Sequence, residues 1–422
     1  MAGGRASSER QRAPELKTDI VVVGAGPAGA AAAIELARAG RSVALVDKAT
    51  FPRDKTCGDG LTSGALRELE ELGLDPAQVA SWTTVRDVVI RSGSGRRIDF
   101  RLPAEGTYCA VARRTDLDAA LVDLARKAGA DVREGAAVTA TEAGDDRVTL
   151  TTGDGERIEA RYVIAADGMW SAVRKHLGGG PQGYLGETHA FRQYFSGVSA
   201  EAARALFVSF ETDLLPGYFW SFPLPDGRAN VGFGIHRGNR YTVRDMAGLW
   251  PELLARPHLR AFLGDDAVAE GPHRAWPIPA RIDDMPATAA GGRALFAGDA
   301  VAATDRLTGE GIAQALITGR LAAQVVMDAG PYRPAQAAER YGRELRRALL
   351  ADHRMSMLLL RLLRRPRATR AGLRAAGAND WTRRNFIRWM FEDEPRAVIA
   401  TPRRWHRNFL TRPGSYLTGE PR

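Results

Sequence analysis

Three glycines near the start of the chain have the spacing of a phosphate-binding turn. Gly24, Gly26 and Gly29 form G-x-G-x-x-G between an apolar run, Ile20 to Val23, and an alanine-rich segment of helical character. Gly24 permits a tight turn, Gly26 lets the backbone approach a pyrophosphate, and Gly29 lets the helix pack closely on the strand. The free N–H groups at the helix N-terminus would face the phosphates.

An acid that follows the next strand supports this interpretation. The apolar run from Ser42 to Val46 ends at Asp47, where a carboxylate can bind ribose hydroxyls. The same glycine spacing recurs at Gly178, Gly180 and Gly183, but no strand precedes it, and we interpret that match as a turn. The first match therefore predicts a nucleotide site, and the alternative is an ordinary alanine-rich strand–helix–strand unit.

The loop after this second strand has a reactive composition. Residues 51–61, FPRDKTCGDGL, carry a thiol, two acids and two cations. Beside a cofactor, such a loop would line a reactive site, and otherwise it is a surface turn with an incidental cysteine. Cys57 could hold a proton as a neutral thiol, since free thiols have a pKa near about 8.5, or Arg53 and Lys55 could instead favour its thiolate. We expect Asp59 to be ionised and hydrogen-bonded to backbone amides of the turn.

Further along the chain, helices and strands alternate. A helix is predicted from Arg114, with acids in its first turn, where the helix dipole favours them. A second, long helix follows Thr308–Gly311, and its N-terminus could face an anionic or polarised group. Asp299, at a strand end, could accept hydrogen bonds from a cofactor sugar or only cap a turn. Residues 130–138 are expected to form a turn and a strand, and residues 148–152 and 157–160 a hairpin. Further strands are expected at 163–166 and in the run before Gly298.

Residues 186–238 lack a helical apolar repeat and predict strands instead. Tyr218, Trp220 and Phe222 alternate along one strand and therefore share a face. This aromatic row could line an apolar cavity, or it could pack a helix on the sheet. The expected strands are 206–210, 218–222 and 229–235, and a turn at 225–227 joins the last two.

From Pro334 onward the chain is predicted to be mostly helical and basic. The apolar stretch from Leu349 to Leu363 is followed by arginines and then by several aromatic residues. A basic amphipathic helix with aromatics can lie in a membrane interface. The same region could equally cap the substrate side of the molecule by ordinary packing.

The composition fits a folded protein without a disulfide framework. With 422 residues, the chain is too long for a single hydrophobic core. Only two residues are cysteines, which suits a reducing cytoplasm. No run is long enough to span a membrane, and residues 1–17 predict a disordered tail without a secretory signal. The net charge of +9 reflects either an arginine-rich surface or attraction to an anionic membrane or phosphorylated substrate. No nucleic-acid motif accompanies it, and no metal site is predicted.

Four motifs together resemble the glutathione-reductase-type FAD fold of flavin hydroxylases and their relatives. They are the glycine turn, Arg114-x-x-Leu117-Asp118, Asp167-Gly168 and Gly298-Asp299-Ala300. The resemblance implies an α/β fold: a Rossmann FAD-binding domain, a second domain with a mixed or antiparallel sheet, and a helical C-terminal region. It divides the chain into a tail (1–17), a discontinuous FAD-binding domain (18–80, 105–180 and 288–333), a substrate-binding sheet domain (81–104 and 181–287) and a basic helical region (334–422).

Within that superfamily, two motifs resemble the geranylgeranyl reductase family. They are residues 52–61, PRDKTCGDGL, and residues 215–223, LPGYFWSFP. That family uses FAD to reduce carbon–carbon double bonds in long isoprenoid chains, such as geranylgeranyl and prenyl-quinone substrates. The resemblance implies an FAD site formed by Gly24, Ala25, Gly26, Pro27, Ala28, Gly29, Asp47, Lys48, Arg53, Cys57, Gly58, Asp59, Gly60, Arg114, Val138, Asp167, Asp299, Gly309, Gly311 and Ile312.

The resemblance also implies a reaction and its partners. Hydride would come from reduced flavin, and Cys57 or Tyr218 would donate the proton, while Tyr218, Trp220 and Phe222 would contact substrate. NADPH or a reduced ferredoxin would supply electrons. The expected partners are a prenylated small molecule or lipid, a redox partner and an anionic membrane surface, and the expected location is cytoplasmic, with peripheral association at the inner face of the membrane.

One departure from the family and two alternatives remain. Arg306 stands where the family usually has a proline, two residues before Thr308. Proline there would shape the loop over the flavin ring, and Arg306 adds a charge in its place. The first alternative is a monooxygenase that hydroxylates or epoxidises an aromatic or terpenoid substrate. The second is a flavin-binding protein without chemistry.

Overall fold

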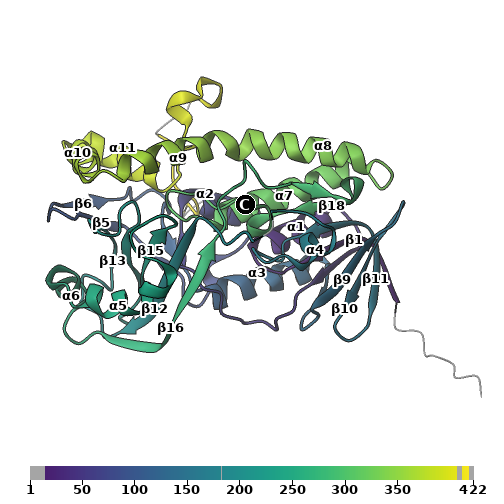
Figure 1. Ribbon diagram of the computed structural model, residues 1–422, viewed down its shortest axis with the longest axis horizontal. Helices are drawn as coiled ribbons and strands as arrows, with labels where there is room; N and C mark the ends of the chain where they lie inside the picture. Colours follow the sequence, from purple (N-terminus) through teal and green to yellow (C-terminus); the bar gives the residue numbers. More distant parts are fainter. Residues whose placement is uncertain (1–14, 182, 406–410, 418–422) are drawn as a thin grey trace, which may run out of the picture.

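The computed structural model describes residues 15–181, 183–405 and 411–417. Two large β-sheets lie side by side, and the C-terminal helices run across both of them (Figure 1). A small three-stranded sheet, formed by β3 (Gly60–Leu61), β7 (Ala110–Val111) and β4 (Thr83–Thr84), lies in a segment that links the two. The expected α/β class is confirmed.

The larger sheet has eight strands and contains the predicted nucleotide unit. Its central strands pair in parallel, and β1 lies between β11 and β2. In chain order its strands are β1 (Glu15–Val23), β2 (Val43–Val46), β8 (Asp131–Arg133), β9 (Val138–Ala143), β10 (Val148–Thr152), β11 (Arg157–Ala165), β17 (Thr288–Ala289) and β18 (Ala294–Phe296).

Two expected boundaries in this sheet were wrong. Residues 15–17, expected at the end of the tail, belong to strand β1, because Leu16 and Thr18 turn inward and Glu15 pairs with Arg157. Residues 1–14 lie outside the described part of the chain. The segments expected as two strands, 157–160 and 163–166, form the single strand β11, which pairs antiparallel with β10 at its start and parallel with β1 along its length.

Helices from distant parts of the chain pack beside this sheet. The helix α1 (Pro27–Arg38) begins with a proline at its first position, where the missing N–H costs nothing, and its alanines are buried between α3 (Arg114–Ala128) and α7 (Ile312–Ala329). Two shorter helices, α2 (Ser63–Glu71) and α4 (Ala172–His176), complete this half.

The smaller sheet has seven strands, and both of its faces are covered. Phe219 and Phe233 pack against α5 (Met246–Leu254) and α6 (Pro257–Leu263) on one face, and Leu206 and Phe210 face the C-terminal helices on the other. The strands in chain order are β5 (Asp87–Ser92), β6 (Arg97–Arg101), β12 (Thr188–Ser196), β13 (Ala205–Phe210), β14 (Phe219–Leu224), β15 (Arg228–His236) and β16 (Val268–Ile278).

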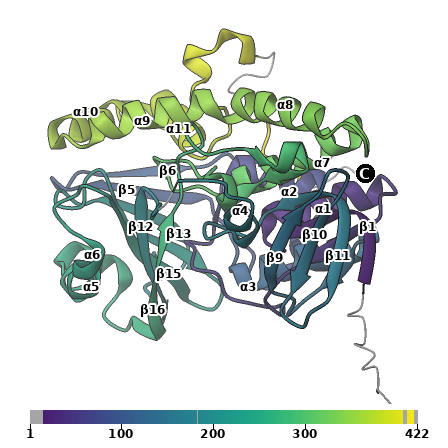
Figure 2. The ribbon, with the colours of Figure 1, turned by 45° about the vertical axis from the view of Figure 1, so that its right-hand side comes forward.

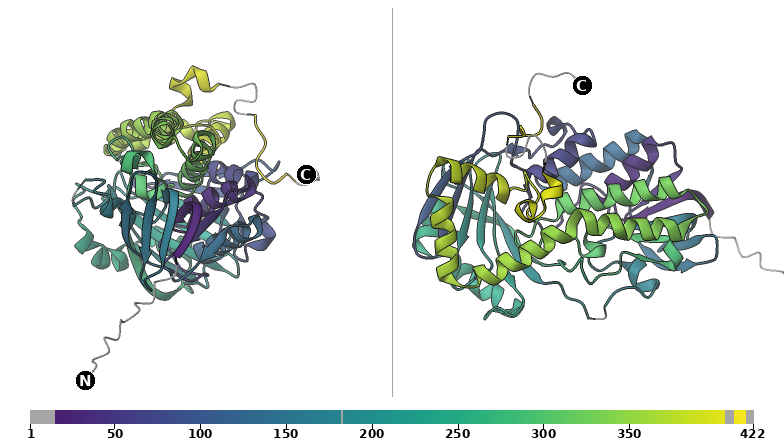
Figure 3. Two further views of the ribbon diagram at one scale, coloured as in Figure 1. Left: turned by 90° about the vertical axis from the view of Figure 1, so that its right-hand side faces the viewer. Right: turned by 90° about the horizontal axis from the view of Figure 1, so that it is seen from above.

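The C-terminal region is helical, as predicted. The helices α8 (Pro334–Leu345) and α9 (Ala351–Leu363) continue one another through a π-helical turn, and α10 (Pro366–Ala376) and α11 (Asp380–Met390) fold back over the smaller sheet (Figures 2 and 3). Among the residues described, none of the helices has the length and hydropathy that a membrane-spanning segment needs. Short 3₁₀ turns occupy Pro76–Gln78, Val243–Asp245, Ala290–Gly292, Gly298–Val301, Val398–Ala400 and Pro402–Arg404.

Candidate active site

A cavity of about 850 Å³ extends from the larger sheet to the smaller sheet, beneath the C-terminal helices. Its volume is in the range of cofactor and ligand pockets. It brings together the glycine turn, the Cys57 loop, the aromatic row and the loop before α7. The predicted residues that line it are Gly24, Gly26, Pro27, Ala28, Asp47, Lys48, Arg53, Cys57, Gly58, Asp59, Gly60, Arg114, Val138, Asp167, Tyr218, Trp220, Phe222, Asp299, Gly309, Gly311 and Ile312.

The glycine turn has two positions that the fold requires and one that it leaves open. Gly24 has φ of +96°, and a Cβ there would lie 2.3 Å from the Ala166 carbonyl oxygen. A Cβ on Gly29 would lie 1.7 Å from the Gly24 oxygen, so Gly29 permits close packing and, like Ala25, lies behind the cavity lining. A Cβ on Gly26 would meet nothing closer than 3.6 Å.

The open space at Gly26 has the electrostatics of a pyrophosphate site. The nearest atoms to a Cβ there would be Nη2 of Arg53 at 3.6 Å and Nη2 of Arg114 at 3.9 Å. Two guanidinium groups therefore lie beside the backbone position where the phosphates are expected, at the N-terminus of α1. The residues present fit FAD at this end of the cavity.

Asp118 holds both of these guanidinium groups. Arg114 donates to its two carboxylate oxygens at 2.7 Å each, and Nη1 of Arg53 lies 2.9 Å from Oδ2. The Asp118 side chain is fully buried, so it acts as an internal counter-charge that orients the arginines. The sequence indicated only that Asp118 lies at the start of a helix. Its ion pair with Arg53 depends on tertiary packing and could not be predicted from the sequence pattern.

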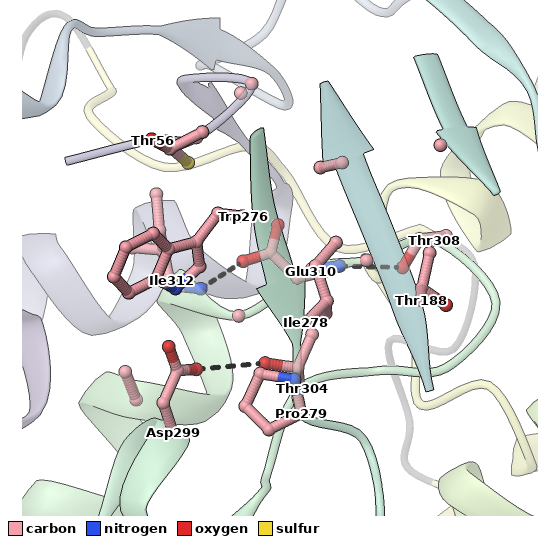
Figure 4. Close-up of a pocket in the computed structure, with 18 of the residues that line it drawn as sticks. Thr56, Thr188, Trp276, Ile278, Pro279, Asp299, Thr304, Thr308, Glu310 and Ile312 are labelled. Carbon is pink, nitrogen blue, oxygen red and sulfur yellow. Dashed lines mark hydrogen bonds between the residues drawn. The ribbon is translucent and has the colours of Figure 1, made fainter. Parts of the chain in front are cut away.

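Two carboxylates lie where cofactor sugars were expected. Asp47 accepts backbone N–H groups from Ala25 at 2.6 Å and Ala49 at 2.8 Å. Asp299 accepts a hydrogen bond from the Thr304 hydroxyl at 3.2 Å, and Lys55 Nζ lies 3.9 Å from it (Figure 4). Both acids also line the cavity, so each combines a turn-stabilising role with access to a ligand.

Among the residues that line the cavity, four buried side-chain atoms have no hydrogen-bond partner in the described part of the chain. They include an acceptor, Oδ1 of Asp167, and a donor, Nε1 of Trp276. Buried polar groups are nearly always paired, so an unpaired acceptor and an unpaired donor in one cavity favour a polar ligand there. The Trp276 ring also lies under Lys55, with Nζ 4.7 Å from the ring centroid.

Cys57 is held as a neutral thiol. Burial raises its pKa, and this effect exceeds the opposing influence of Arg114 and Lys55. Of the two alternatives from the sequence, the raised pKa favours the neutral thiol, because loss of solvation penalises the charged form more strongly than the cations compensate. The Asp59 backbone N–H donates to Cys57 Sγ at 3.3 Å.

The expected partners of Asp59 were also wrong. Its Oδ2 accepts hydrogen bonds from the Tyr194 hydroxyl at 2.7 Å and from Asn230 Nδ2 at 2.8 Å, and the turn amides are not used among the described contacts. Burial raises the pKa of the Asp59 carboxyl to about 6. Asn230 also donates to the Cys57 carbonyl oxygen at 2.8 Å, so the smaller sheet fixes this loop.

The aromatic row lines the cavity from the smaller sheet. The rings of Tyr218 and Trp220 are 6.1 Å apart and those of Trp220 and Phe222 are 6.2 Å apart. A Cβ on Gly60 would lie 3.1 Å from the Phe222 ring, so this ring packs directly on the Cys57 loop. The Tyr218 hydroxyl donates to the Thr308 carbonyl oxygen in the loop before α7.

A buried group of acids joins the C-terminal region to that loop, and the sequence did not indicate it. Arg396 Nη2 lies 2.9 Å from Glu392 Oε1 and 3.4 Å from Asp305 Oδ1. Glu310 accepts the backbone N–H groups of Ile312 and Ala313 (Figure 4). Burial raises the pKa values of Glu310 and Glu392, and Glu310 lines the cavity as a further candidate proton donor.

Comparisons with known proteins agree with this geometry. A family model described as an FAD binding domain matches residues 17–213. The chain is 36% identical over 345 residues to a menaquinone reductase of Mycobacterium tuberculosis, covering 77% of this chain and 81% of that protein. It is 32% identical over 327 residues to a digeranylgeranylglycerophospholipid reductase of Methanopyrus kandleri, covering 74% and 78%.

Solved structures show the same fold. A geranylgeranyl bacteriochlorophyll reductase-like protein from Thermoplasma acidophilum superposes with a TM-score of 0.77 at 22% identity, covering 93% of this chain and all of that one. The halogenase PltM, in a complex with phloroglucinol and FAD, superposes with a TM-score of 0.66 at 17% identity, covering 91% and 85%.

Proposed function

The chain belongs to the geranylgeranyl reductase family of FAD-dependent oxidoreductases, and from this membership we propose that it saturates carbon–carbon double bonds of an isoprenoid chain. The observation that carries the proposal is one cavity in which a glycine turn with two arginines meets an aromatic, apolar wall. A dinucleotide and a long hydrocarbon chain need these two environments side by side.

The two ends of the cavity would divide the binding. We propose that residues 18–80, 105–180 and 288–333 hold FAD through the twenty positions expected from the sequence, and that residues 81–104 and 181–287 bind substrate. Residues 334–422 would cover the hydrocarbon chain of the substrate, since Leu363, Leu373 and Phe386 of this region line the cavity together with the aromatic row. Such a wall excludes water from the reacting atoms.

When bound and reduced at this site, FAD would supply the hydride for one alkene carbon. A proton must reach the other carbon, and the half-buried, neutral thiol of Cys57 carries one beside the cavity. Tyr218 is the second candidate donor from the sequence, with its hydroxyl bonded to the Thr308 carbonyl oxygen. Glu310 is a third, because burial favours its protonated form. An isolated alkene is a poor electrophile, so the proton donor should strongly affect the rate.

Electron supply and membrane contact are further parts of the proposal. NADPH or a reduced ferredoxin would reduce the flavin, with the ferredoxin acting as a redox partner. The arginine-rich C-terminal helices carry exposed Trp381 and Leu358, which would let the protein approach an anionic membrane from the cytoplasmic side to collect a prenylated lipid.

Anaerobic turnover distinguishes reduction from the monooxygenase alternative. The holoenzyme would be reduced chemically under argon and mixed with a panel of prenyl lipids, and the products would be analysed by mass spectrometry. Products heavier by two hydrogen atoms per bond support reduction. Products that form only with oxygen and gain one oxygen atom would overturn it. Reduced flavin that is never reoxidised by any member of the panel would favour a binding protein without chemistry.

A further inference from the structure

A second cavity, of about 530 Å³, adjoins the first and is strongly basic. Five arginines line it with one carboxylate, Glu187, and one histidine, His236. They come from the end of β15 and the residue after it, the loop before β12, the loop after β16, the loop before α7 and the C-terminal end of α9. The arginines are Arg237, Arg281, Arg306, Arg361 and Arg364.

The single carboxylate does not neutralise this cavity. Glu187 is buried and accepts hydrogen bonds from the Ala280 backbone N–H at 2.8 Å and from Arg281 Nε at 3.0 Å. Arg237 donates to backbone carbonyl oxygens of residues 185 and 186. These contacts account for one arginine charge and leave the others without a counter-charge.

Besides Arg237, three arginines of this cavity lack any carboxylate partner among the described residues. Arg306 Nη1 has only the sulfur of Met357, at 3.4 Å, and no ion pair forms on Arg361 or Arg364 within the described ranges. Burial, together with the positive charges of Arg306 and Arg364, lowers the pKa of His236 to about 4. Unpaired guanidinium groups that converge on one cavity bind phosphate oxygens well.

The two cavities are joined at named residues. His236 and Arg306 line both, and the His236 Nδ1 lies 3.0 Å from the hydroxyl of Thr188, which lines the larger cavity. An extended ligand can therefore lie with an apolar part among Val208, Leu363 and the aromatic row and with its other end among the arginines.

We propose that the basic cavity binds the phosphate or diphosphate head group of the isoprenoid substrate. This inference rests on the proposed function and narrows its substrate to isoprenoids with an anionic head group. A neutral quinone head would leave the arginine charges uncompensated, whereas a diphosphate would pair with several of them. Arg306 is then a specificity-determining residue, because it contacts both cavities.

Calorimetric titration of the FAD-loaded protein tests the inference without turnover. The probes are geranylgeranyl diphosphate, geranylgeraniol, inorganic diphosphate and NADPH. Wild-type protein should bind the diphosphate at least about 10-fold more tightly than the alcohol, since charge-assisted hydrogen bonds distinguish them. Inorganic diphosphate should compete with geranylgeranyl diphosphate but not with geranylgeraniol.

Single-charge variants locate the site. Arg306→Gln and Arg364→Gln should each weaken the binding of geranylgeranyl diphosphate by roughly 10-fold and leave the affinity for geranylgeraniol nearly unchanged. Arg354→Gln is the matched control, because Arg354 is an exposed arginine of α9 outside the cavity. Arg364 is exposed, so Arg364→Gln should fold normally and test the site even if Arg306→Gln impairs folding. Flavin content and melting temperature show whether each variant is folded.

Three results would overturn the inference. The first is equal affinity of the wild-type protein for the diphosphate and the alcohol, and the second is an equal loss of affinity for both ligands in the variants. The third is a loss of NADPH binding alone, which would assign the arginines to the dinucleotide phosphate. If phosphate-dependent binding is found but no double bond is ever reduced, the proposed function fails while this site stands.

Discussion

The hydroxyl of Tyr194 donates a 2.7 Å hydrogen bond to Oδ2 of Asp59, and this contact fixes the Cys57 loop to strand β12 of the smaller sheet. The two residues are 135 positions apart in the chain. The loop beside the proposed flavin site is therefore held by the sheet that forms the proposed substrate site, so the two halves of the cavity are positioned together.

The Asp59 carboxyl should make stability depend on pH. Its pKa of about 6 in the folded protein lies above the ordinary value of 3.8, so the folded state holds the proton more tightly. This stabilisation is complete below pH 3.8 and is lost as pH rises through about 6. Full ionisation costs about 3 kcal/mol of unfolding free energy. Asp59→Asn should therefore gain stability relative to wild type as pH rises from 4 to about 6, measured by denaturant unfolding.

Tyr194→Phe is the control for that experiment. It removes one hydrogen bond to the same carboxylate but keeps the titrating group, so the pH dependence should remain and shift to higher pH. A difference between Asp59→Asn and wild type that is constant from pH 4 to about 7 would contradict the assignment to Asp59.

Gly26→Val should remove FAD without unfolding the protein. The Gly26 backbone is extended, with φ of −73°, and a Cβ there meets no atom closer than 3.6 Å, so the fold tolerates the side chain while the pyrophosphate does not. Gly29→Ala is the matched comparison, because its Cβ would overlap the Gly24 oxygen and destabilise the fold itself. Flavin absorbance and thermal melting separate the two effects. A folded Gly26→Val protein with full flavin content would disprove the site.

Trp220→Ala should reduce turnover of long prenyl substrates and leave flavin content intact. Trp220 lines the cavity, and its Nε1 donates to Oδ1 of Asn230 at 3.1 Å, so the variant removes an apolar surface and one hydrogen bond to Asn230, which itself donates to the Cys57 carbonyl oxygen. Trp220→Phe keeps a ring and should retain most activity. Phe219→Ala, on the opposite face, should cost about 3–5 kcal/mol of stability. If Trp220→Ala unfolds like Phe219→Ala, packing rather than substrate contact explains the row.

Cys57→Ala should slow alkene reduction by about 10²-fold or more, the usual scale for a lost general acid. FAD binding and flavin reduction should be normal, and substrate-dependent reoxidation under argon should be lost. Cys57→Ser keeps a hydroxyl of higher pKa and should also be slow. Glu310→Gln and Tyr218→Phe in the same assay compare the other candidates. Unchanged reoxidation in Cys57→Ala would leave that thiol a structural role.

The C-terminal helices should bind anionic liposomes at low salt and release them at high salt, since exposed charges are screened. Flotation with anionic and neutral vesicles measures this directly. Replacing the exposed Trp381, 68% accessible, with alanine should weaken retention if the ring inserts at the interface. Equal binding to neutral vesicles, or no binding to either, would contradict the prediction.

Local patterns predicted the elements whose signals lie within short segments. The glycine turn, α1 and β2 were recognised because their strand, helix and acid follow one another directly. The alternation of Tyr218, Trp220 and Phe222 placed three rings on one face, and that face lines the cavity. Strand β16 was missed, since Gly271 and Pro272 interrupt its sequence and most of it is exposed at a sheet edge.

The contacts that define the loops were not predictable from the sequence alone. The Asp59 carboxylate is hydrogen-bonded to Asn230, which is 171 residues away in the chain. Arg396 pairs with Asp305, from a distant part of the sequence. Such pairs depend on tertiary packing, which also determines whether burial or nearby charge controls a pKa. That competition explains why the cations around Cys57 did not indicate its protonation state.

The wall of residues 359–391 over the cavity has a consequence for biosynthesis. Synthesis proceeds from the N-terminus, and domains fold in that order as the chain emerges from the ribosome. The larger sheet and α7 are complete once Ala329 has emerged, so the nucleotide half can assemble first. The hydrocarbon half stays open until Phe391 and Arg396 have been added. A growing chain can thus acquire its cofactor before the hydrocarbon half of the cavity is closed.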